Sequence, residues 1–397
     1  MKINHFVACA LLAPCALAAQ AHAFDVVEAG QPVVTGEPSR VGPPWNHRST
    51  INIPGTKTDI AFGGYVKLDA FYDFDYDLGT STNPYAVMNP GNRTDGRTSF
   101  TAYESRLNFR THTATDYGRL TTYFEGHFVP DGKFGLRHAY GELNGFLAGQ
   151  TWSNFMSFVG GTRTLALGDP KGYAFERQAQ LRYTQPVGEG SFSVALENPT
   201  TVIARNDASV ADGESQLPDL TLRYEYKRLF ALSGIARQLS TNNITNTIDD
   251  EVTGYGVQAQ FNLPFNASTS LRGSATYGEG IGNYMGNPGN VGHRNAPDVY
   301  VKGNNLETIE TQAFGLSLNH YWTDSWFSSV GVSRLEQDLP AGYGDHFETL
   351  DYGFANVIWD VTERMSVGLE YQHADIEQVN GVSNDASRLQ ASATFQF

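Results

Sequence analysis

The sequence has 397 residues, of which 40% are hydrophobic and 12% aromatic, and its formal net charge is −15 at pH 7. This acidic balance disfavours nucleic acid as a partner, because phosphate backbones attract basic surfaces. The mean hydropathy is −0.34. Such a value fits a soluble β protein, and it also fits a membrane barrel, because half of the barrel's strand residues face a polar lumen.

The first residues have the layout of a secretory signal peptide. Lys2 supplies a positive charge, 6–19 is apolar, and Ala21-His22-Ala23 has the small-x-small pattern of a cleavage site. We predict a signal peptide over 1–23, whose removal leaves 374 residues (397 − 23) with a charge of −16 (−15 − 1). Both cysteines, Cys9 and Cys15, lie inside this segment. The mature protein is therefore expected to hold together without disulfides.

Residues 24–59 have a different texture, with scattered glycine and few apolar pairs. We interpret this segment as an extended or flexible periplasmic leader. Its prolines are Pro32, Pro38, Pro43, Pro44 and Pro54. No run of about eighteen apolar residues follows the signal peptide, so we expect no membrane-spanning helix.

From residue 60 onward, polar and apolar residues alternate in about sixteen segments. Alternation with a period of two is typical of a β-strand that has one apolar face. The predicted strands are 60–74, 99–112, 118–129, 134–144, 146–153, 174–184, 190–199, 218–227, 229–239, 252–263, 268–279, 309–322, 326–336, 347–359, 364–376 and 386–397.

The connections between these strands alternate between long and short. Long loops are predicted at 75–98, 154–173, 200–217, 240–251 and 280–308, and short turns at 113–117, 185–189, 227–228, 264–267 and 323–325. Only 130–133 is a short connection where a long one is expected. Long loops at one end and short turns at the other are typical of an outer-membrane barrel with an even number of strands. We therefore predict an all-β, transmembrane antiparallel β-barrel over 60–397.

The chain ends on the alternating segment "RLQASATFQF". Leu389, Ala391, Ala393, Phe395 and Phe397 form its apolar face. In lipid every backbone group must be paired, so the last strand is expected to pair with the first and leave no edge. The terminal aromatic residue resembles the signal that the bacterial barrel assembly machinery reads.

Alternation also places many arginines on the lumen face. Rings or ladders of arginine favour anions in pores, and a guanidinium group matches a carboxylate in bidentate fashion. The alternative is structural, because the inward Glu104 and Glu125 could neutralise these arginines as salt bridges within the wall. The predicted pore-lining or solute-contacting residues are Lys67, Arg106, Arg110, Arg119, Arg137, Arg182, Arg223 and, in the third long loop, Arg163.

The segment "DFDYDLG" sets Asp73, Asp75 and Asp77 on one face near a predicted rim. Such carboxylates fit either a divalent cation site or a solvated loop base. No motif of a hydrolase, zinc protease or nucleotide-binding enzyme is present. His138 and His320 lie on or near outward positions. We expect no enzyme activity, no cofactor and no metal.

Several motifs are similar to those of a known family. "FGGYVKLDAFYDFD", "ESRLNFRT", "DYGRLTTYFEGHF", "LRHAYGELNGFLAGQTWSNFM" and "RQAQLRYTQP", within 60–186, resemble the DcaP-like family of trimeric outer-membrane porins. The resemblance implies a sixteen-stranded trimeric channel for small anionic solutes such as dicarboxylates. It also implies that Arg106, Arg110, Arg119 and Arg137 line the pore. Many members have a helical segment before the barrel, whereas this leader is rich in proline and cannot continue as a helix.

Three functions remain open from the sequence. The first is an outer-membrane porin of a Gram-negative bacterium, a homotrimer that passes small, preferentially anionic solutes. The second is a barrel that acts mainly as an anchor or surface-interaction protein, with a loop such as 280–308 binding a partner. The third is a soluble exported β protein that binds carbohydrate. The partners expected for the first are outer-membrane lipid, the barrel assembly machinery and small anions.

Overall fold

The computed structural model describes residues 50–207, 209–241, 250–285 and 296–397. These residues belong to one compact unit, 33–397. The predicted signal peptide and residues 24–49 of the predicted leader lie outside the described residues, so both stay predictions. Among the residues described, no helix is both long and apolar enough to cross a membrane.

The described chain folds into a closed antiparallel barrel of sixteen strands, as predicted. The second of them is built from two pieces, β3 and β4, which pair with successive parts of β2. The barrel strands are β2 (Thr58–Asp73), β3 (Arg97–Thr101) with β4 (Arg106–Thr115), β5 (Gly118–His127), β6 (Gly135–Leu143), β7 (Phe146–Trp152), β8 (Arg177–Val187), β9 (Gly190–Glu197), β12 (Asp219–Tyr226), β13 (Phe230–Ser240), β14 (Glu251–Pro264), β15 (Thr269–Glu279), β18 (Glu310–Tyr321), β19 (Trp326–Asp338), β20 (Phe347–Thr362), β21 (Met365–Gln378) and β22 (Ser383–Gln396).

The break between β3 and β4 corrects the predicted strand 99–112. Residues 102–105 leave the ladder there. The side chain of Ser105 replaces the missing backbone partner, because its Oγ accepts from Lys67 N at 3.0 Å and donates to Lys67 O at 3.3 Å. The backbone of β2 thus stays satisfied across the gap.

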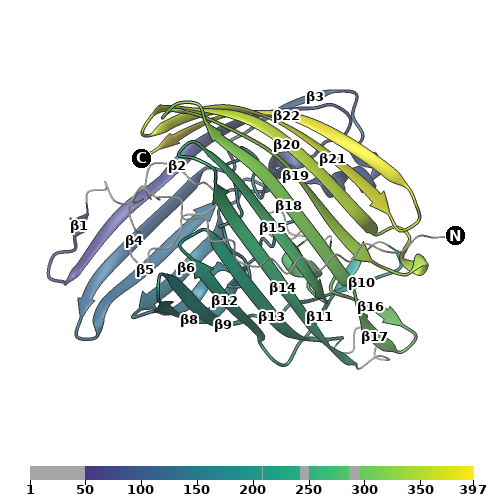
Figure 1. Cartoon of the computed structure of the whole chain (residues 1–397), viewed down its shortest axis with the longest axis horizontal. Coiled ribbons are helices and arrows are strands. Elements are labelled where there is room, and N and C mark those ends of the chain that lie inside the picture. Colours follow the sequence, from purple (N-terminus) through teal and green to yellow (C-terminus); the bar gives the residue numbers. More distant parts are fainter. Residues whose placement is uncertain (1–49, 208, 242–249, 286–295) are drawn as a thin grey trace. The chain divides into compact units, whose positions relative to one another are not determined.

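The barrel closes where β2 pairs with β22, from Tyr65↔Gln396 to Asp73↔Arg388. Figure 1 shows this seam, with the purple β2 and the yellow β22 at opposite ends of the colour scale. At the end of the seam Phe397 N donates to Gly64 O at 3.2 Å. A short strand, β1 (Ile51–Asn52), pairs with the first part of β2. β2 and β22 are thus paired continuously over nine residues each.

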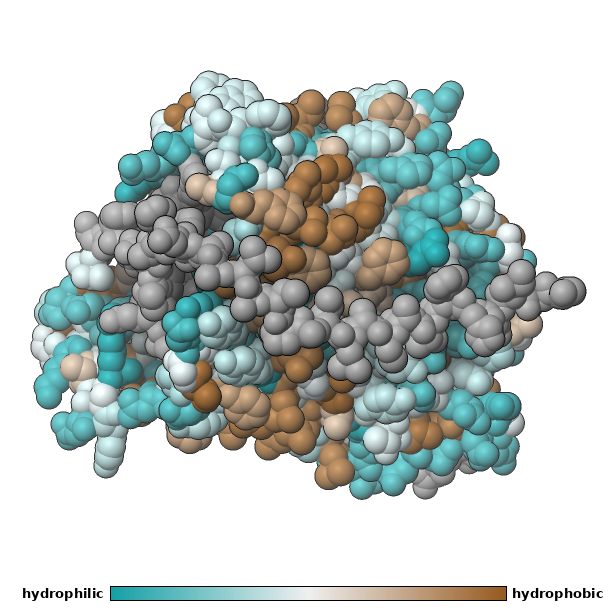
Figure 2. All heavy atoms as spheres, in the orientation of Figure 1, coloured by the Kyte–Doolittle hydropathy of each residue, from teal (hydrophilic) through white to brown (hydrophobic). Residues whose placement is uncertain are grey.

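The outer face of the barrel is apolar, as the alternation predicts. Val66, Leu68 and Phe395 are about half exposed, whereas the intervening Lys67 and Asp69 are buried inside. Figure 2 shows apolar residues over the middle of the visible face and hydrophilic residues toward its left and right ends. Trp326 and Trp359 stack at 5.5 Å near one end of their strands. A belt with aromatic residues at its border is the surface that a lipid bilayer requires.

Long and short connections also alternate as predicted. We name the long ones that matter below L1 (74–96), L3 (153–176), L4 (198–218) and L6 (280–309). L1 contains three short 3-10 helices, η2 (Gly79–Ser81), η3 (Pro84–Met88) and η4 (Pro90–Asn92), and another, η5 (Ala341–Tyr343), follows β19. L4 and L6 together form a four-stranded sheet, in the order β11–β10–β16–β17. Its strands are β10 (Thr201–Ala204), β11 (Val210–Gly213), β16 (Val299–Lys302) and β17 (Asn305–Thr308). L6 also contains a short helix, α1 (Gly282–Met285).

Three long loops fold into the barrel and share one apolar cluster there. L1 contributes Tyr85 and Val87, L3 contributes Phe155, and L6 contributes Tyr284, all of them buried. Wall residues such as Phe347, whose ring lies 5.1 Å from that of Tyr85, complete the cluster. Burial of these apolar surfaces fixes the loops inside the barrel.

Polar wall residues hold the tip of L3 by its backbone. Glu370 is fully buried, and its carboxylate accepts from Leu165 N at 2.8 Å and from Ala166 N at 3.0 Å. Lys67 Nζ and Gln390 Nε2 donate to Leu165 O at 2.6 and 3.1 Å. A loop inside a barrel needs such partners, because its backbone groups cannot all reach water.

A first prediction concerns the seam. Replacing Phe397 with aspartate puts a charge on the outward, apolar face of the closing strand, so a smaller fraction of the protein should fold into a barrel. The yield of heat-modifiable barrel on unboiled gels measures this. Gln396→Asp, a charge on the inward neighbour, is the matched control and should fold like the wild type. Equal yields for both variants would contradict the prediction.

A second prediction concerns the tip of L3. Glu370→Gln removes a charged acceptor from two backbone N–H groups, and hydrogen bonds to charged groups contribute about 1.5–3 kcal/mol. Amide hydrogens of 164–167 should then exchange with deuterium at least about tenfold faster. Glu363→Gln, the same change in an exposed short turn, is the control. Unchanged exchange in a folded Glu370→Gln variant would show that the apolar cluster alone holds the loop.

Candidate functional site: the arginine wall

L3 follows one half of the barrel wall. Its partners there run from β9 round to β2 and include backbone and side-chain groups of the wall. They are Ser193 and Glu197 on β9, Thr221, Arg223 and Glu225 on β12, Gln260 on β14, Arg272 on β15, Asn319 on β18, Ser329 on β19, Asn356 and Asp360 on β20, Glu370 on β21, Gln390 on β22 and Lys67 on β2. The returning arm stays on the same side, since Asp169 bonds to Tyr352 of β20. On the other half, β4–β8, Phe158 and Phe175 of L3 pack on Trp152 of β7, with ring centres 5.6 and 4.5 Å away.

The β4–β8 half of the wall carries the predicted arginine ladder. Arg106 and Arg110 on β4 are opposite His127 and Tyr123 of β5. Because a strand rises about 3.3 Å per residue, the two arginines lie about 13 Å apart along the wall. Arg119, near the short-turn end of β5, is exposed. Arg137 and Arg182 continue the ladder on β6 and β8.

A β-bulge turns two neighbouring residues of β6 into the barrel. The register shifts between Glu125 and Gly126 of β5, so Arg137 and His138 both point inward. Arg137 Nε donates to Glu125 at 2.9 Å, and His138 Nδ1 is 3.0 Å from Thr151 Oγ1. The outward position predicted for His138 is therefore wrong, because a bulge puts two successive residues on one face.

Two of the arginines are paired with the glutamates that the sequence offers as alternatives. Glu125 lies 2.9 Å from Arg137 Nε and 3.7 Å from Arg106 Nη1, and it accepts from Tyr123 OH at 2.7 Å. Glu104 lies 3.4 Å from Arg106 Nη2 and also pairs with Lys67. Through these ion pairs, Arg106 and Arg137 stabilise the wall.

Aromatic rings hold the guanidinium groups against the wall. Arg106 lies 5.2 Å from the centre of the Tyr65 ring, and Arg110 lies 5.2 Å from that of Tyr123. These cation–π contacts stabilise a positive charge without neutralising it. They keep the arginines extended along the wall.

A second stack lies at the long-loop end of this wall. The ring of Trp152 is 4.6 Å from Arg177 and 5.7 Å from Arg137. Arg177 was not among the predicted pore residues, because alternation in the predicted strand 174–184 puts it on the outward face. The strand begins at Arg177, next to Trp152 in register, and alternation gives no information on which ring an arginine meets.

The same region has hydrogen-bond donors that lack acceptors. Tyr140 OH, Trp152 Nε1 and Arg182 Nε are buried and have no hydrogen-bond partner among the described residues. A buried donor without a partner costs about 1–3 kcal/mol. Water or a solute with acceptor oxygens would satisfy these groups, so the chemistry of this wall suits oxyanions.

Three other predicted residues hold L3 instead of extending the ladder. Lys67 binds Leu165 O and lies 3.4 Å from Asp69. Arg163 of L3 forms a bidentate pair with Asp360, at 2.8 and 2.5 Å. Arg223 Nη1 donates to the carbonyl of Met156 at 2.5 Å. The structure thus gives these three a role in placing the loop.

The acidic segment after β2 does not gather around one point. Asp73 is fully buried and pairs with Arg388 at 2.6 Å, and Asp77 pairs with Arg97 at 2.6 Å. Within the described ranges, no group of three His, Cys, Asp or Glu residues could hold a metal ion. The charges of Asp73 and Asp77 are balanced by the guanidinium groups of Arg388 and Arg97.

Comparisons with known proteins agree with the barrel. A family profile described as a porin subfamily matches residues 51–396. Among solved structures, the outer-membrane channel DcaP of Acinetobacter baumannii superposes with a TM-score of 0.78 at 20% identity, over 88% of this chain and all of that one. The anion-selective porin from Comamonas acidovorans shares the fold with a TM-score of 0.56 at 10% identity, over 86% of this chain and all of that one. OmpT of Vibrio cholerae shares it with a TM-score of 0.54 at 12% identity, over 88% of this chain and all of that one. The search of curated proteins found no match.

The profile covers nearly the whole barrel, and the structure has the closed sixteen-stranded wall and inward loop of such channels. The protein is thus an outer-membrane channel of a Gram-negative bacterium. Its predicted likeness to DcaP-like porins is confirmed at the level of family and fold. The chain belongs to the porin subfamily of outer-membrane channels.

Proposed function

We propose that this porin passes small hydrophilic solutes and prefers anions, with dicarboxylates as the best-fitting class. One observation carries the proposal: the hydrogen bonds of L3 described above hold it to the β9–β2 half of the wall, and the opposite half carries the arginine ladder. In a narrow lumen, fixed charges are screened less than at the outer surface. The formal charge of −15 for the whole chain therefore does not oppose an anion preference inside.

The spacing of the ladder supports solutes with two carboxylates. Arg106 and Arg110 lie about 13 Å apart along the wall, and the stack of Arg137 and Arg177 on Trp152 lies beyond them. A guanidinium group binds a carboxylate with two parallel hydrogen bonds. A short dicarboxylate can engage one arginine before it leaves the previous one, so it moves along the wall in steps.

Removing a wall arginine should change ion selectivity. Arg110→Ala should shift the reversal potential in a salt gradient toward cations, and Arg106→Ala with Arg110→Ala should shift it further, because Glu104 and Glu125 then lose a positive partner. Uptake of succinate into proteoliposomes should slow, while an uncharged sugar of similar size should enter as fast or slightly faster.

Arg364→Ala removes the same charge from an exposed short turn and is the control. Folded variants with wild-type ion preference would mean that the arginines only brace the wall. A wild-type barrel that passes no steady current in a planar bilayer would favour the anchor or surface-interaction function.

We further propose that three copies assemble in the membrane, as the family resemblance implies. The outer face of β4–β7 supports this, because one register row there consists of small residues that let another barrel approach closely. The row is Thr111, Thr122, Gly141 and Ala148.

Native mass spectrometry in mild detergent should therefore give three times the mass of the mature chain. Thr122→Arg, a large charged side chain within this row, should convert that mass to one chain while leaving the barrel heat-modifiable. A single-chain mass for the wild type would overturn the proposed trimer.

A further inference from the structure

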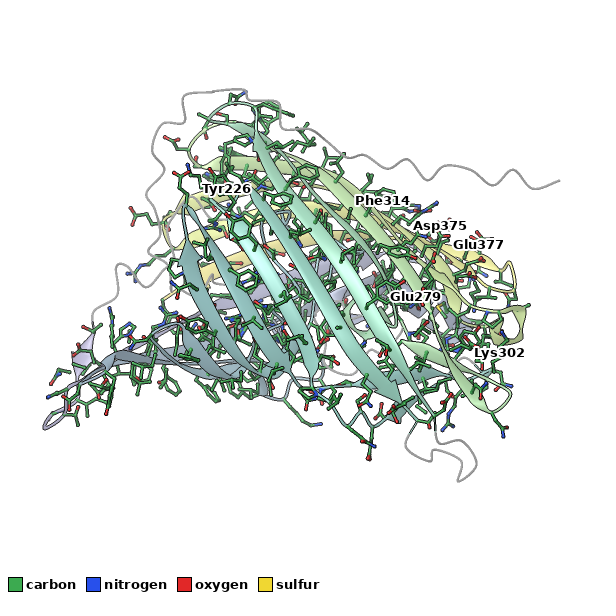
Figure 3. The ribbon with its side chains drawn as sticks, turned by 60° about the horizontal axis from the view of Figure 1, so that its bottom comes forward. Tyr226, Glu279, Lys302, Phe314, Asp375 and Glu377 are labelled. Atoms are coloured by element: carbon green, nitrogen blue, oxygen red, sulfur yellow. The ribbon has the colours of Figure 1, made fainter. Side chains whose placement is uncertain are left out.

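L4 and L6 build a compact cap at the long-loop end of the barrel. The small sheet β11–β10–β16–β17 packs by Ile203, Val299 and Leu306 on Leu239 of the wall strand β13. At the rim, Thr308 Oγ1 donates to Glu279 at 2.7 Å. Figure 3 shows Lys302, at the turn between β16 and β17, on the same side as Glu279 and Glu377 near the ends of their strands. The described parts of these loops therefore cover the mouth next to β12–β15.

One fully buried arginine joins this cap to the wall. Arg237 lies on β13, and its guanidinium group donates to Asp219 of β12 at 2.9 Å. Its other bonds go to loops, namely to Asp298 at 2.8 Å, Gly280 O at 2.6 Å and Thr200 O at 2.5 Å. Three of its four acceptors thus belong to L4 or L6.

Asp298 and Tyr284 extend the same network. Asp298 accepts from Val202 N of β10 and from Asn283 N of α1, both at 2.9 Å. Tyr284 lies under the guanidinium group at 5.0 Å and donates its hydroxyl to Asp219 at 2.9 Å. Loss of the arginine would leave the buried carboxylates of Asp219 and Asp298 without their charge partner, which is strongly unfavourable.

The cap also rests on L3. The ring of Tyr284 lies 5.8 Å from that of Phe155 in the outgoing arm, and Phe175 N in the returning arm donates to Tyr284 O at 2.9 Å. Helix α1 is completely buried inside the barrel mouth. The described part of L6 is therefore an inward segment that stacks on L3.

We propose that the L4–L6 cap is a second size filter outside L3, and that Arg237 is the positioning residue that holds it in the lumen. The inference is independent of the proposed anion preference and needs only that the chain is a porin. Because most bonds of Arg237 go to loops, its loss should release the cap and widen the path on the β12–β15 side. A role in the wall alone would not change which solutes pass.

The test is the entry of uncharged sugars of increasing size into proteoliposomes. For Arg237→Met, the ratio of raffinose to arabinose uptake should rise by at least about threefold over the wild type. Arg237→Lys keeps the charge with fewer donors, so its uptake ratio should lie between those of the wild type and Arg237→Met. Arg334→Met is the matched control, because Arg334 forms an ion pair with Asp351 on the outer face; it should leave the ratio unchanged.

Heat-modifiability on unboiled gels verifies the barrel in every variant. If Arg237→Met yields no barrel, Asp298→Asn and Tyr284→Phe release the same cap with smaller changes and should raise the same ratio. A folded Arg237→Met, or both folded milder variants, with the wild-type ratio would overturn the proposal. Lower heat stability with an unchanged ratio would do so too, since it would limit Arg237 to the wall.

Discussion

Closure of the sheet is the constraint on which the other features of this molecule depend. Lipid offers no hydrogen bonds, so the backbone of every strand must be paired with a neighbour. The seam from Tyr65↔Gln396 to Asp73↔Arg388 meets this requirement for the first and last strands. Because the outer face of the barrel contacts lipid, the polar residues of each strand must face the lumen. Buried Lys67, Glu125 and Gln390 are a consequence of this geometry.

A barrel of sixteen strands is too wide for wall side chains to fill, so loops occupy the space. Apolar residues of L1, L3 and L6 bury one another in a common cluster. Their backbones need partners as well, and the inward polar residues provide them: Glu370 binds two N–H groups of L3, and Gln390 binds a carbonyl. The polar face that closure produces thus places the loops, and it holds L3 on the β9–β2 half of the wall.

The strands and the pattern of connections could be predicted because a period of two is a local property. The bulge at Arg137 of β6 and the break before β4 could not, since each depends on the partner strand. The hydrogen-bond partners of the side chains could not be predicted either, because they are far apart in the sequence. Lys67 contacts Leu165 at a separation of 98 residues, and Arg388 contacts Asp73 at a separation of 315. Alternation says which face a side chain is on, but not what lies opposite. The ladder was therefore predicted as a set, while the role of Lys67, Arg163 and Arg223 in holding L3 was not.

The contribution of an inward arginine to the electric field in the lumen depends on the groups that accept its hydrogen bonds. Arg163 is matched by both oxygens of Asp360, and Arg237 by four groups of the wall and loops. Such arginines add little to the field in the lumen, because their partners neutralise them where they stand. On β4–β8, Arg106 and Arg137 also have carboxylate partners, whereas Arg110 lies over the Tyr123 ring. Arg182 Nε has no hydrogen-bond partner among the described residues. Under the proposed function, the field that a solute meets depends on the arginines of this wall, even though arginines occur around the whole barrel.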